Sequence, residues 1–224
     1  MSAKRMTVLK GFDYMHCDDF AKYLSDMAAK GWHFVEWGVG LKFEKGEPEQ
    51  AVYSVEVFQN ASENDLRPEP NTQEFAEYCE SAGWKFIDAK QKFCIFKKID
   101  ETAMDLFTSE ERVTNSFKST VGGTAWALLF IYGLNVLLQW GRLFNDFESV
   151  IFTGGFLFAI LICNALFLRQ LMSISYAFIK KYKLIKEIRL GNKVYIGSKI
   201  DEKFRLSWND IYIAILVLLL LFLF

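Results

Sequence analysis

The chain has 224 residues, with 26 Lys and Arg against 27 Asp and Glu, and its formal net charge of −1 excludes a globally basic nucleic-acid-binding protein. Charge is unevenly placed: residues 1–118 hold 15 basic and 21 acidic side chains, whereas residues 169–207 hold 10 basic and 3 acidic ones. The sequence therefore predicts an acidic soluble part joined to an apolar part with one basic segment. This organisation disfavours a single-domain soluble enzyme.

The first elements follow from local patterns. Residues 7–12 predict a strand, and Asp18 or Asp19 can cap a helix that ends at Gly31. Aromatic and β-branched residues then alternate with polar ones over residues 32–37, and residues 41–45 continue as the partner strand. The first part of the chain thus predicts the order β-α-β-β.

The same order returns in the next part. Residues 51–58 predict a strand, a helix begins at Asn71 or Thr72 and ends at Gly83, and residues 84–87 and 93–98 predict a hairpin. Residues 23–34, YLSDMAAKGWHF, align without a gap with residues 75–86, FAEYCESAGWKF. A repeat of this length is typical of one supersecondary unit used twice. The predicted fold class is α+β: residues 1–105 form a duplicated β-α-β-β domain with a curved antiparallel sheet and two helices.

Residues 106–120 predict a linker helix, and residues 121–224 predict an all-α membrane domain of three helices. Spans are expected at about 121–140, 150–172 and 208–224, because each stretch is strongly apolar. The third is the shortest of the three and is predicted to span with local thinning of the bilayer.

Basic side chains set the predicted orientation. The connection 173–207 carries nine Lys and Arg, against one in 141–149, so it is expected in the cytoplasm together with the N-terminal domain, and the C-terminus outward. Apolar residues recur at helical spacing over 174–188. This basic helix could contact the membrane surface, dock on a partner or on the acidic domain, or only retain the topology. Its contact residues are expected to be Lys180, Lys181, Lys183, Lys186 and Arg189.

A ligand pocket with aromatic walls and acidic groups is a further hypothesis. Stacking and cation–π attraction would suit a flat or cationic ligand there. The alternative is that the two equivalent tryptophans, Trp32 and Trp84, only fill the core beneath each helix. Glu56 is informative because a carboxylate in the middle of a strand must be solvated, paired or lining a cavity. The candidate residues are Trp32, Phe34, Glu36, Trp37, Tyr53, Glu56, Phe58 and Trp84.

Motifs for catalysis and metal binding are absent from the sequence. There is no phosphate-binding loop, nucleophile elbow or HExxH motif, and the four cysteines include no CxxC pair. His16 and His33 lack ligand spacing to other metal-binding residues. We therefore expect no catalytic residues, no metal, no cofactor and no enzymatic activity.

The run FAKYLSDMAAKGWHFVEW, followed by FEKGEP, YSVEVF, FAEYCESAGWKFI and FCIFKK and then by apolar spans, resembles the DUF2812 family of bacterial membrane proteins. The resemblance covers most of residues 6–100 and implies a multi-pass protein of the bacterial cell membrane. Members are often encoded beside PadR-like transcriptional regulators, which implies a sensory or regulatory role. The resemblance brings no catalytic residues.

Three functions remain open from the sequence. The first is a membrane-anchored cytoplasmic sensor or interaction protein with a regulatory role, whose partners would be the lipid bilayer, a PadR-like regulator or another membrane subunit, and a small cationic or aromatic ligand. The second is a structural assembly subunit of a membrane complex, and the third is a small transport component. The long spans hold no acidic residue in their interior, which disfavours transport. No direct nucleic-acid binding is expected.

Overall fold

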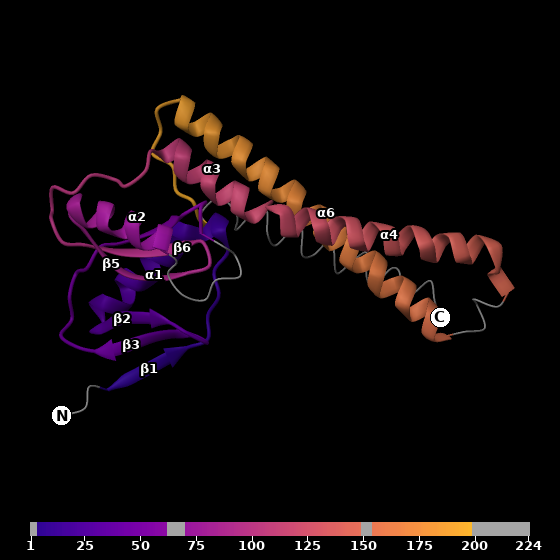
Figure 1. The fold of residues 1–224 in the computed structure, drawn as a ribbon, viewed down its shortest axis with the longest axis horizontal. Coiled ribbons are helices and arrows are strands. Elements are labelled where there is room, and N and C mark those ends of the chain that lie inside the picture. The colour runs from indigo at the N-terminus through magenta and orange to yellow at the C-terminus, as the bar shows by residue number, and fades with distance from the viewer. Residues whose placement is uncertain (1–3, 62–69, 149–153, 199–224) are drawn as a thin grey trace. The chain divides into compact units, whose positions relative to one another are not determined.

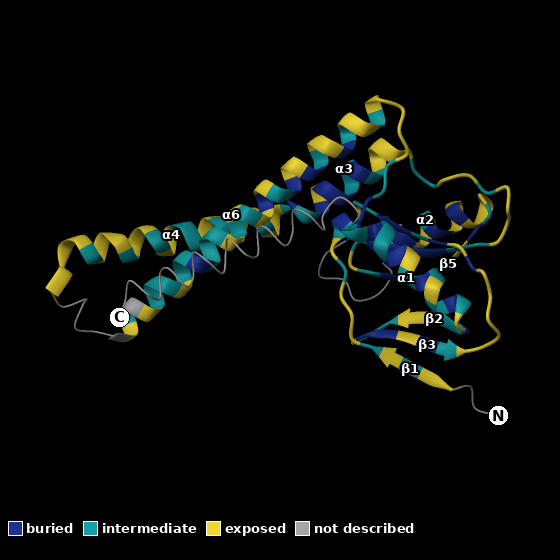
Figure 2. Cartoon of the chain, turned by 180° about the vertical axis from the view of Figure 1, so that it is seen from behind, coloured by how far each residue is buried: buried dark blue, intermediate teal, exposed yellow. Residues whose placement is uncertain are grey.

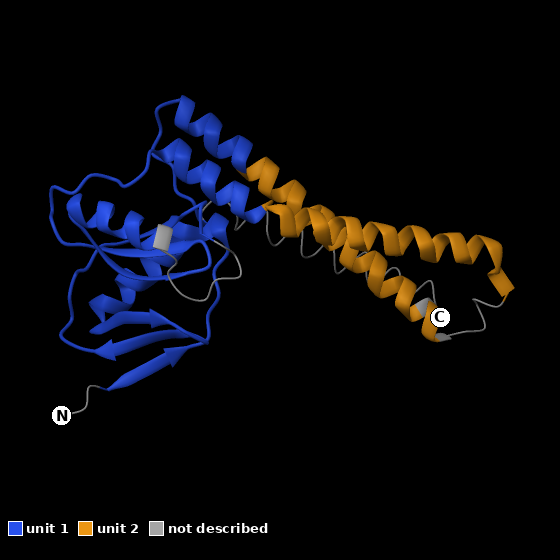
Figure 3. Ribbon diagram, in the orientation of Figure 1, with its two compact units in different colours: residues 1–120, 181–198 blue, residues 121–180, 199–224 orange. Residues whose placement is uncertain are grey.

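A computed structural model of the chain describes residues 4–61, 70–148 and 154–198. The chain divides into two compact units (Figure 3). Unit 1 holds residues 1–120 and 181–198, and unit 2 holds residues 121–180 and 199–224. The predicted boundary at residue 105 therefore differs from the observed one, because residues 106–120 and part of the basic segment group with the α+β unit.

Unit 1 begins with the first predicted β-α-β-β series (Figure 1). Its elements are β1 (Arg5–Val8), a short 3-10 helix η1 (Tyr14–His16), α1 (Cys17–Ala29), β2 (Trp32–Trp37) and β3 (Leu41–Lys45). The strands form a three-stranded antiparallel sheet in the order β1-β3-β2. Asp18 and Asp19 lie in the first turn of α1, where the helix dipole favours acidic groups, but the predicted cap at one of them is wrong, because the N-cap is His16 and it makes no side-chain capping hydrogen bond.

The second β-α-β-β series directly follows the first along the chain. Strand β4 (Tyr53–Val57), helix α2 (Pro70–Ser81), β5 (Trp84–Lys90) and β6 (Phe93–Lys98) produce a second three-stranded antiparallel sheet, in the order β4-β6-β5. The prediction of one curved sheet is therefore wrong: the described strands form two sheets. Helix α1 contacts both β2 and β4, so one helix covers strands of both sheets.

The two sheets share details of register. Trp32 and Trp84, the first residues of β2 and β5, each lie opposite the lysine that ends the neighbouring strand. Each of these strands then has a register irregularity after its third residue, Phe34 in one and Phe86 in the other. A bulge bends a strand and increases its twist.

One apolar core extends through both sheets. Phe20 and Leu24 of α1 are fully buried with Phe43 of β3, and the same cluster includes Val55 of β4 and Ile95 of β6. Aromatic contacts add to it: Phe20 stacks on Phe12 at 4.3 Å between ring centroids. A smaller cluster under α2 contains Cys79, Trp84, Ala89, Cys94 and Phe96.

Glycine is required where α1 ends. Replacing Gly31 with Ala should destabilise the full-length chain more than replacing Gly191, although both have positive φ, at 76° and 77°. In both variants, placing an L-residue at positive φ would cost about 1–2 kcal/mol of stability. At Gly31, however, a Cβ would lie 2.7 Å from the carbonyl oxygen of Gly46, whereas at Gly191 it would meet nothing within 4 Å. Urea titrations should show the larger loss for Gly31→Ala, and equal losses would contradict this explanation.

Helix α3 (Ser109–Thr120) lies within the predicted linker helix, residues 106–120, and belongs to unit 1. Its start is a capping box, in which the side chains of Thr108 and Glu111 exchange hydrogen bonds with the opposite backbone. Val113 and Phe117 are buried on its inner face. After only two residues the chain continues as α4 (Gly123–Asn145).

Among the residues that the structure describes, two helices are long and apolar enough to cross a membrane, by length and composition. The first apolar stretch forms α4, and the second lies largely in α6 (Gly154–Arg189), which continues through the predicted basic helix. Only 6% and 11% of their most apolar windows are buried, and exposed positions predominate along α4 in Figure 2. This exposure distinguishes them from the core helices of a soluble protein. The third predicted span, 208–224, lies outside the described residues.

Candidate functional site

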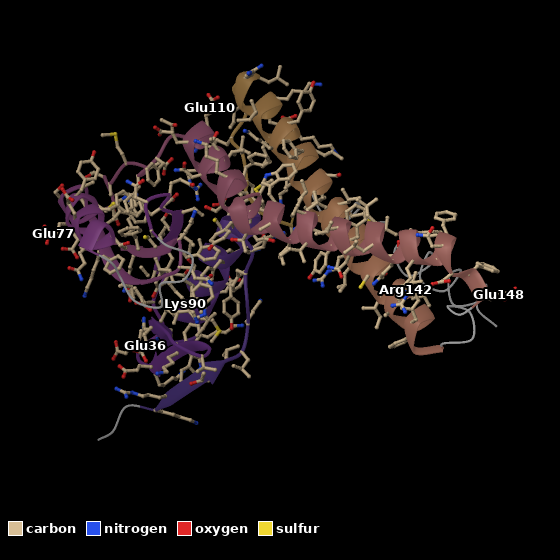
Figure 4. The ribbon with its side chains drawn as sticks, turned by 45° about the vertical axis from the view of Figure 1, so that its right-hand side comes forward. Glu36, Glu77, Lys90, Glu110, Arg142 and Glu148 are labelled. Carbon is tan, nitrogen blue, oxygen red and sulfur yellow. The ribbon has the colours of Figure 1, made fainter. Side chains whose placement is uncertain are left out.

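The predicted aromatic–acidic residues lie at several separate places in unit 1. Trp37 packs edge-on against the core residue Phe20 at 5.1 Å, and Phe58 stacks on Phe75 at 4.6 Å. Glu36 is exposed, as Figure 4 shows, and pairs with Lys42.

The equivalent tryptophans have similar neighbours but different burial. Trp84 is 5% exposed, and its indole N–H donates to the carbonyl oxygen of Met104 at 2.8 Å. Trp32 is half-buried, with the ammonium of Lys45 at 5.1 Å from its ring centroid. The alternative interpretation of these tryptophans as core residues therefore fits Trp84 better than Trp32.

Phe34 and Tyr53 line a groove with a volume of about 580 Å³. Its apolar part also includes Ile87 and Ile99. Its polar part consists of His33, Glu49, Lys85, Lys97 and Lys98, so the groove is edged mainly by cations rather than by the carboxylates that were predicted.

Hydrogen bonds occupy part of this polar edge. The ammonium of Lys97 donates to the carboxylate of Glu49 at 2.7 Å, and Nδ1 of His33 lies 3.7 Å from the same carboxylate. The hydrogen bond from Lys97 holds the pKa of Glu49 below its usual range. Lys85 lies directly opposite Lys97 on the neighbouring strand. The carboxylate of Glu49 therefore contacts Lys97 and His33.

A second polar cluster is centred on Arg112 of α3. Its guanidinium donates from Nε to Glu56 at 3.0 Å and from Nη2 to Asp18 at 2.7 Å. Ser54 also donates to Glu56, at 2.6 Å. Of the three environments expected for Glu56, solvated, paired or lining a cavity, the structure shows an ion pair, and its side chain is only 3% exposed. Burial raises the pKa of Glu56, and the Arg112 guanidinium acts against that rise.

The N-terminal end of α1, where Asp18 lies, also binds the segment that follows α6. Asp18 accepts a hydrogen bond from the backbone N–H of Ile196 at 2.6 Å, and its own N–H donates to the Ile196 carbonyl at 3.1 Å. Asp19 accepts from the hydroxyl of Tyr195 at 2.9 Å and from the backbone N–H of Ser198 at 2.6 Å. Partial burial opposes ionisation, but hydrogen bonds from His16, Tyr195 and Ser198 hold the pKa of Asp19 below its ordinary value.

Sequence reasoning did not identify Arg112, Tyr195 or Ser198 as members of this cluster. The one available signal was the mid-strand position of Glu56, which left open whether its carboxylate is solvated, paired or lining a cavity. Asp18 and Asp19 were assigned only to the start of α1, and they also bind these distant residues.

The predicted basic contact residues differ in exposure. Lys180 is 1% exposed, with its ammonium 5.7 Å from the ring centroid of Tyr176. Within unit 1, the ammonium of Lys181 lies 4.3 Å from the ring centroid of Phe117. The remaining three residues, Lys183, Lys186 and Arg189, are exposed.

Two of the four cysteines are unreactive thiols. Cys17 and Cys79 are buried, and burial raises the pKa of each to about 12, so both are thiols at neutral pH. Among the residues that the structure describes, no three His, Cys, Asp or Glu side chains are grouped so that they could hold a metal ion.

Comparison with protein families gives one match: the model described as "Protein of unknown function (DUF2812)" matches residues 17–131. The matched region contains α1, both sheets beyond β1, α3 and the start of α4. No curated protein and no solved structure matches the chain.

Proposed function

The chain belongs to the DUF2812 family, and we propose that this member is a membrane-anchored regulatory protein, a sensor or interaction protein whose α+β unit is coupled to its apolar helices. The family has no assigned function, so the proposal depends on the contacts within unit 1 and on the properties of α4 and α6. The α+β unit would lie in the cytoplasm, and α4 and α6 would cross the membrane.

The observation that carries the proposal is the position of Arg112. It lies on α3, which is separated from α4 by only two residues, and it binds carboxylates of α1 and β4. A planar guanidinium held by two carboxylates fixes the side chain in one geometry. Any rearrangement of α1 against β4 would therefore act on α3, and through the chain on α4.

A second connection supports the same idea. Asp18 and Asp19 hold residues 195–198, the segment that follows α6. The chain thus enters the first apolar helix and leaves the second through segments that are bound at one end of α1. A domain joined to its membrane anchor by the chain alone would not need two sets of hydrogen bonds between α1 and the segments that flank the apolar helices.

The exposed apolar surfaces of α4 and α6 support membrane insertion, since water would solvate them poorly. In the proposal the basic residues 173–207 lie in the cytoplasm, residues 208–224 form a third span, and the C-terminus faces outward. The matching register of the two sheets supports a duplicated β-α-β-β unit. A PadR-like regulator or another membrane subunit would be the protein partner.

Coupling can be tested in lipid nanodiscs with the full-length chain carrying a spin label at Ala127, an exposed position on α4. Cys163 would first be replaced by Ser, because the other three cysteines are buried. Replacing Arg112 with Lys keeps the charge but loses the fork that binds two carboxylates. We expect this change to alter the mobility of the label, measured by electron paramagnetic resonance.

Arg5→Lys is the matched control, because Arg5 forms an exposed ion pair with Glu44 in the same unit and its side chain is 78% exposed. This change should leave the label unaffected. Should both variants give the spectrum of the parent protein, α3 would be a passive tether, and a structural assembly subunit would become the better interpretation.

A membrane-impermeant reagent should also label a cysteine placed at Asp146, but not one at Lys22, in intact cells.

A further inference from the structure

We propose that the groove between β2 and β5 is a binding site for a small organic anion with an aromatic or aliphatic body. This inference rests on the proposed sensory function and names the class of ligand that the site would take. It reverses the sign expected from the sequence, which favoured a cationic ligand in acidic surroundings.

The first argument is the register of β5 and β6. Lys85 and Lys97 are direct cross-strand partners, an arrangement that places like charges side by side and destabilises a sheet. The equivalent pair in the other sheet is His33 opposite Glu44, which lacks this repulsion. An anion bound at the groove would offset the repulsion between these two lysines.

The second argument is the balance of charge around the groove. Three lysines and His33 face a single carboxylate, Glu49, which already accepts a hydrogen bond from Lys97 at 2.7 Å. Residues 1–118 as a whole carry 15 basic against 21 acidic side chains. The groove is thus a positively charged site on an acidic unit, and it would attract an anion that the remaining surface repels.

The third argument is the apolar wall of the groove. Phe34 and Tyr53 are 4% and 6% exposed, and Ile87 lies at the bulge of β5, between Phe86 and Asp88. Apolar walls with a few charged groups at one edge are typical of sites for small organic ligands, and about 580 Å³ accommodates one. The charged edge would bind a carboxylate or sulfonate, and the wall would contact the body of the ligand.

The test uses two probes with the same aromatic body and opposite charge, 2-naphthoate and 2-naphthylmethylammonium. Binding to the full-length chain would be measured by equilibrium dialysis in nanodiscs of zwitterionic lipid, with empty nanodiscs subtracted. We expect saturable binding of the carboxylate only. Lys85→Gln should weaken it about five- to tenfold, because one charge-assisted contact is lost.

Lys22→Gln provides the matched control, since Lys22 is exposed on α1 and lies outside the groove. It should bind 2-naphthoate like the parent chain. Lys85→Gln should also melt at the same temperature as the parent chain or higher, because it removes a repulsion, so weaker binding could not be attributed to unfolding.

Several outcomes would overturn the inference: no saturation by 2-naphthoate, equal binding of the cationic probe, or equal weakening by Lys22→Gln and Lys85→Gln. The spin-label experiment on Arg112 reports coupling without any ligand. Failure of dialysis with a positive spin-label result would therefore reject the ligand class and keep the proposed function, and the reverse result would reject coupling and keep the site.

Discussion

Replacing Arg112 with Met should lower the free energy of unfolding of the full-length chain by about 3–5 kcal/mol, the cost of leaving a buried charge without its partner. Glu56 is 3% exposed and would keep only the hydrogen bond from Ser54. Asp18 would lose the same guanidinium but would keep the N–H of Ile196. Urea titration followed by near-ultraviolet circular dichroism would measure the change.

The double variant Arg112→Met with Glu56→Gln separates this explanation from a general loss of packing. Removing both charges leaves a polar group that can still accept the hydrogen bond from Ser54, so most of the lost stability should return. A double variant as unstable as Arg112→Met alone would show that the guanidinium stabilises the unit by other contacts.

The loss caused by Arg112→Met should also depend on pH. Burial raises the pKa of Glu56 above its ordinary value of 4.5, and removing the guanidinium that opposes this rise would raise it further. A carboxyl with a raised pKa in the folded state contributes stability below its unfolded pKa and loses it as the pH rises through the folded pKa. The variant should therefore be closest to the parent chain at acidic pH, below the folded pKa of Glu56, and furthest from it at higher pH. A difference independent of pH would exclude Glu56 as the cause.

Phe20→Ala should cost about 3–5 kcal/mol, the usual loss for truncating a fully buried aromatic side chain. Phe20 is 0% exposed, stacks on Phe12, and meets Trp37 of one sheet and Phe93 of the other. Because one core serves both sheets, we expect a single unfolding transition at a lower urea concentration.

Tyr78→Ala is the comparison for Phe20→Ala, since Tyr78 is an aromatic residue of α2 that is 68% exposed. Its replacement should change stability by no more than about 0.5 kcal/mol. Two separate transitions in Phe20→Ala, one for each sheet, would contradict a shared core.

Phe20 and Arg112 also bear on the proposed function. Phe20 helps to hold the two sheets together, and the groove lies where β2 of one sheet neighbours β5 of the other. Arg112 joins α1 and β4 to α3. In these proposals, an anion bound between the sheets would act on α1 and β4. Arg112, which binds both elements, would transmit the change to α3.

Much of the fold could be predicted from local sequence. The strand and helix order of both halves, the stops at Gly31 and Gly83, and the apolar stretches of α4 and α6 all follow from periodicity and turn chemistry over neighbouring residues. Family membership could be recognised from the GWxF motifs and their surroundings. The sequence also indicated that Glu56 must be solvated, paired or lining a cavity, because a charge inside a strand has few alternatives.

The tertiary structure decided which distant residues meet. Arg112 reaches Glu56 across 56 residues, and Tyr195 reaches Asp19 across 176 residues, and no periodic pattern encodes such pairs. The groove likewise combines His33 of one sheet with Lys85 and Lys97 of the other. A charged side chain near a surface can pair with any of several others, and the packing of the sheets and helices determines which of them it contacts. For this reason the sequence determined the elements, while the environment of Glu56, its partner and the sign of the groove depended on the fold.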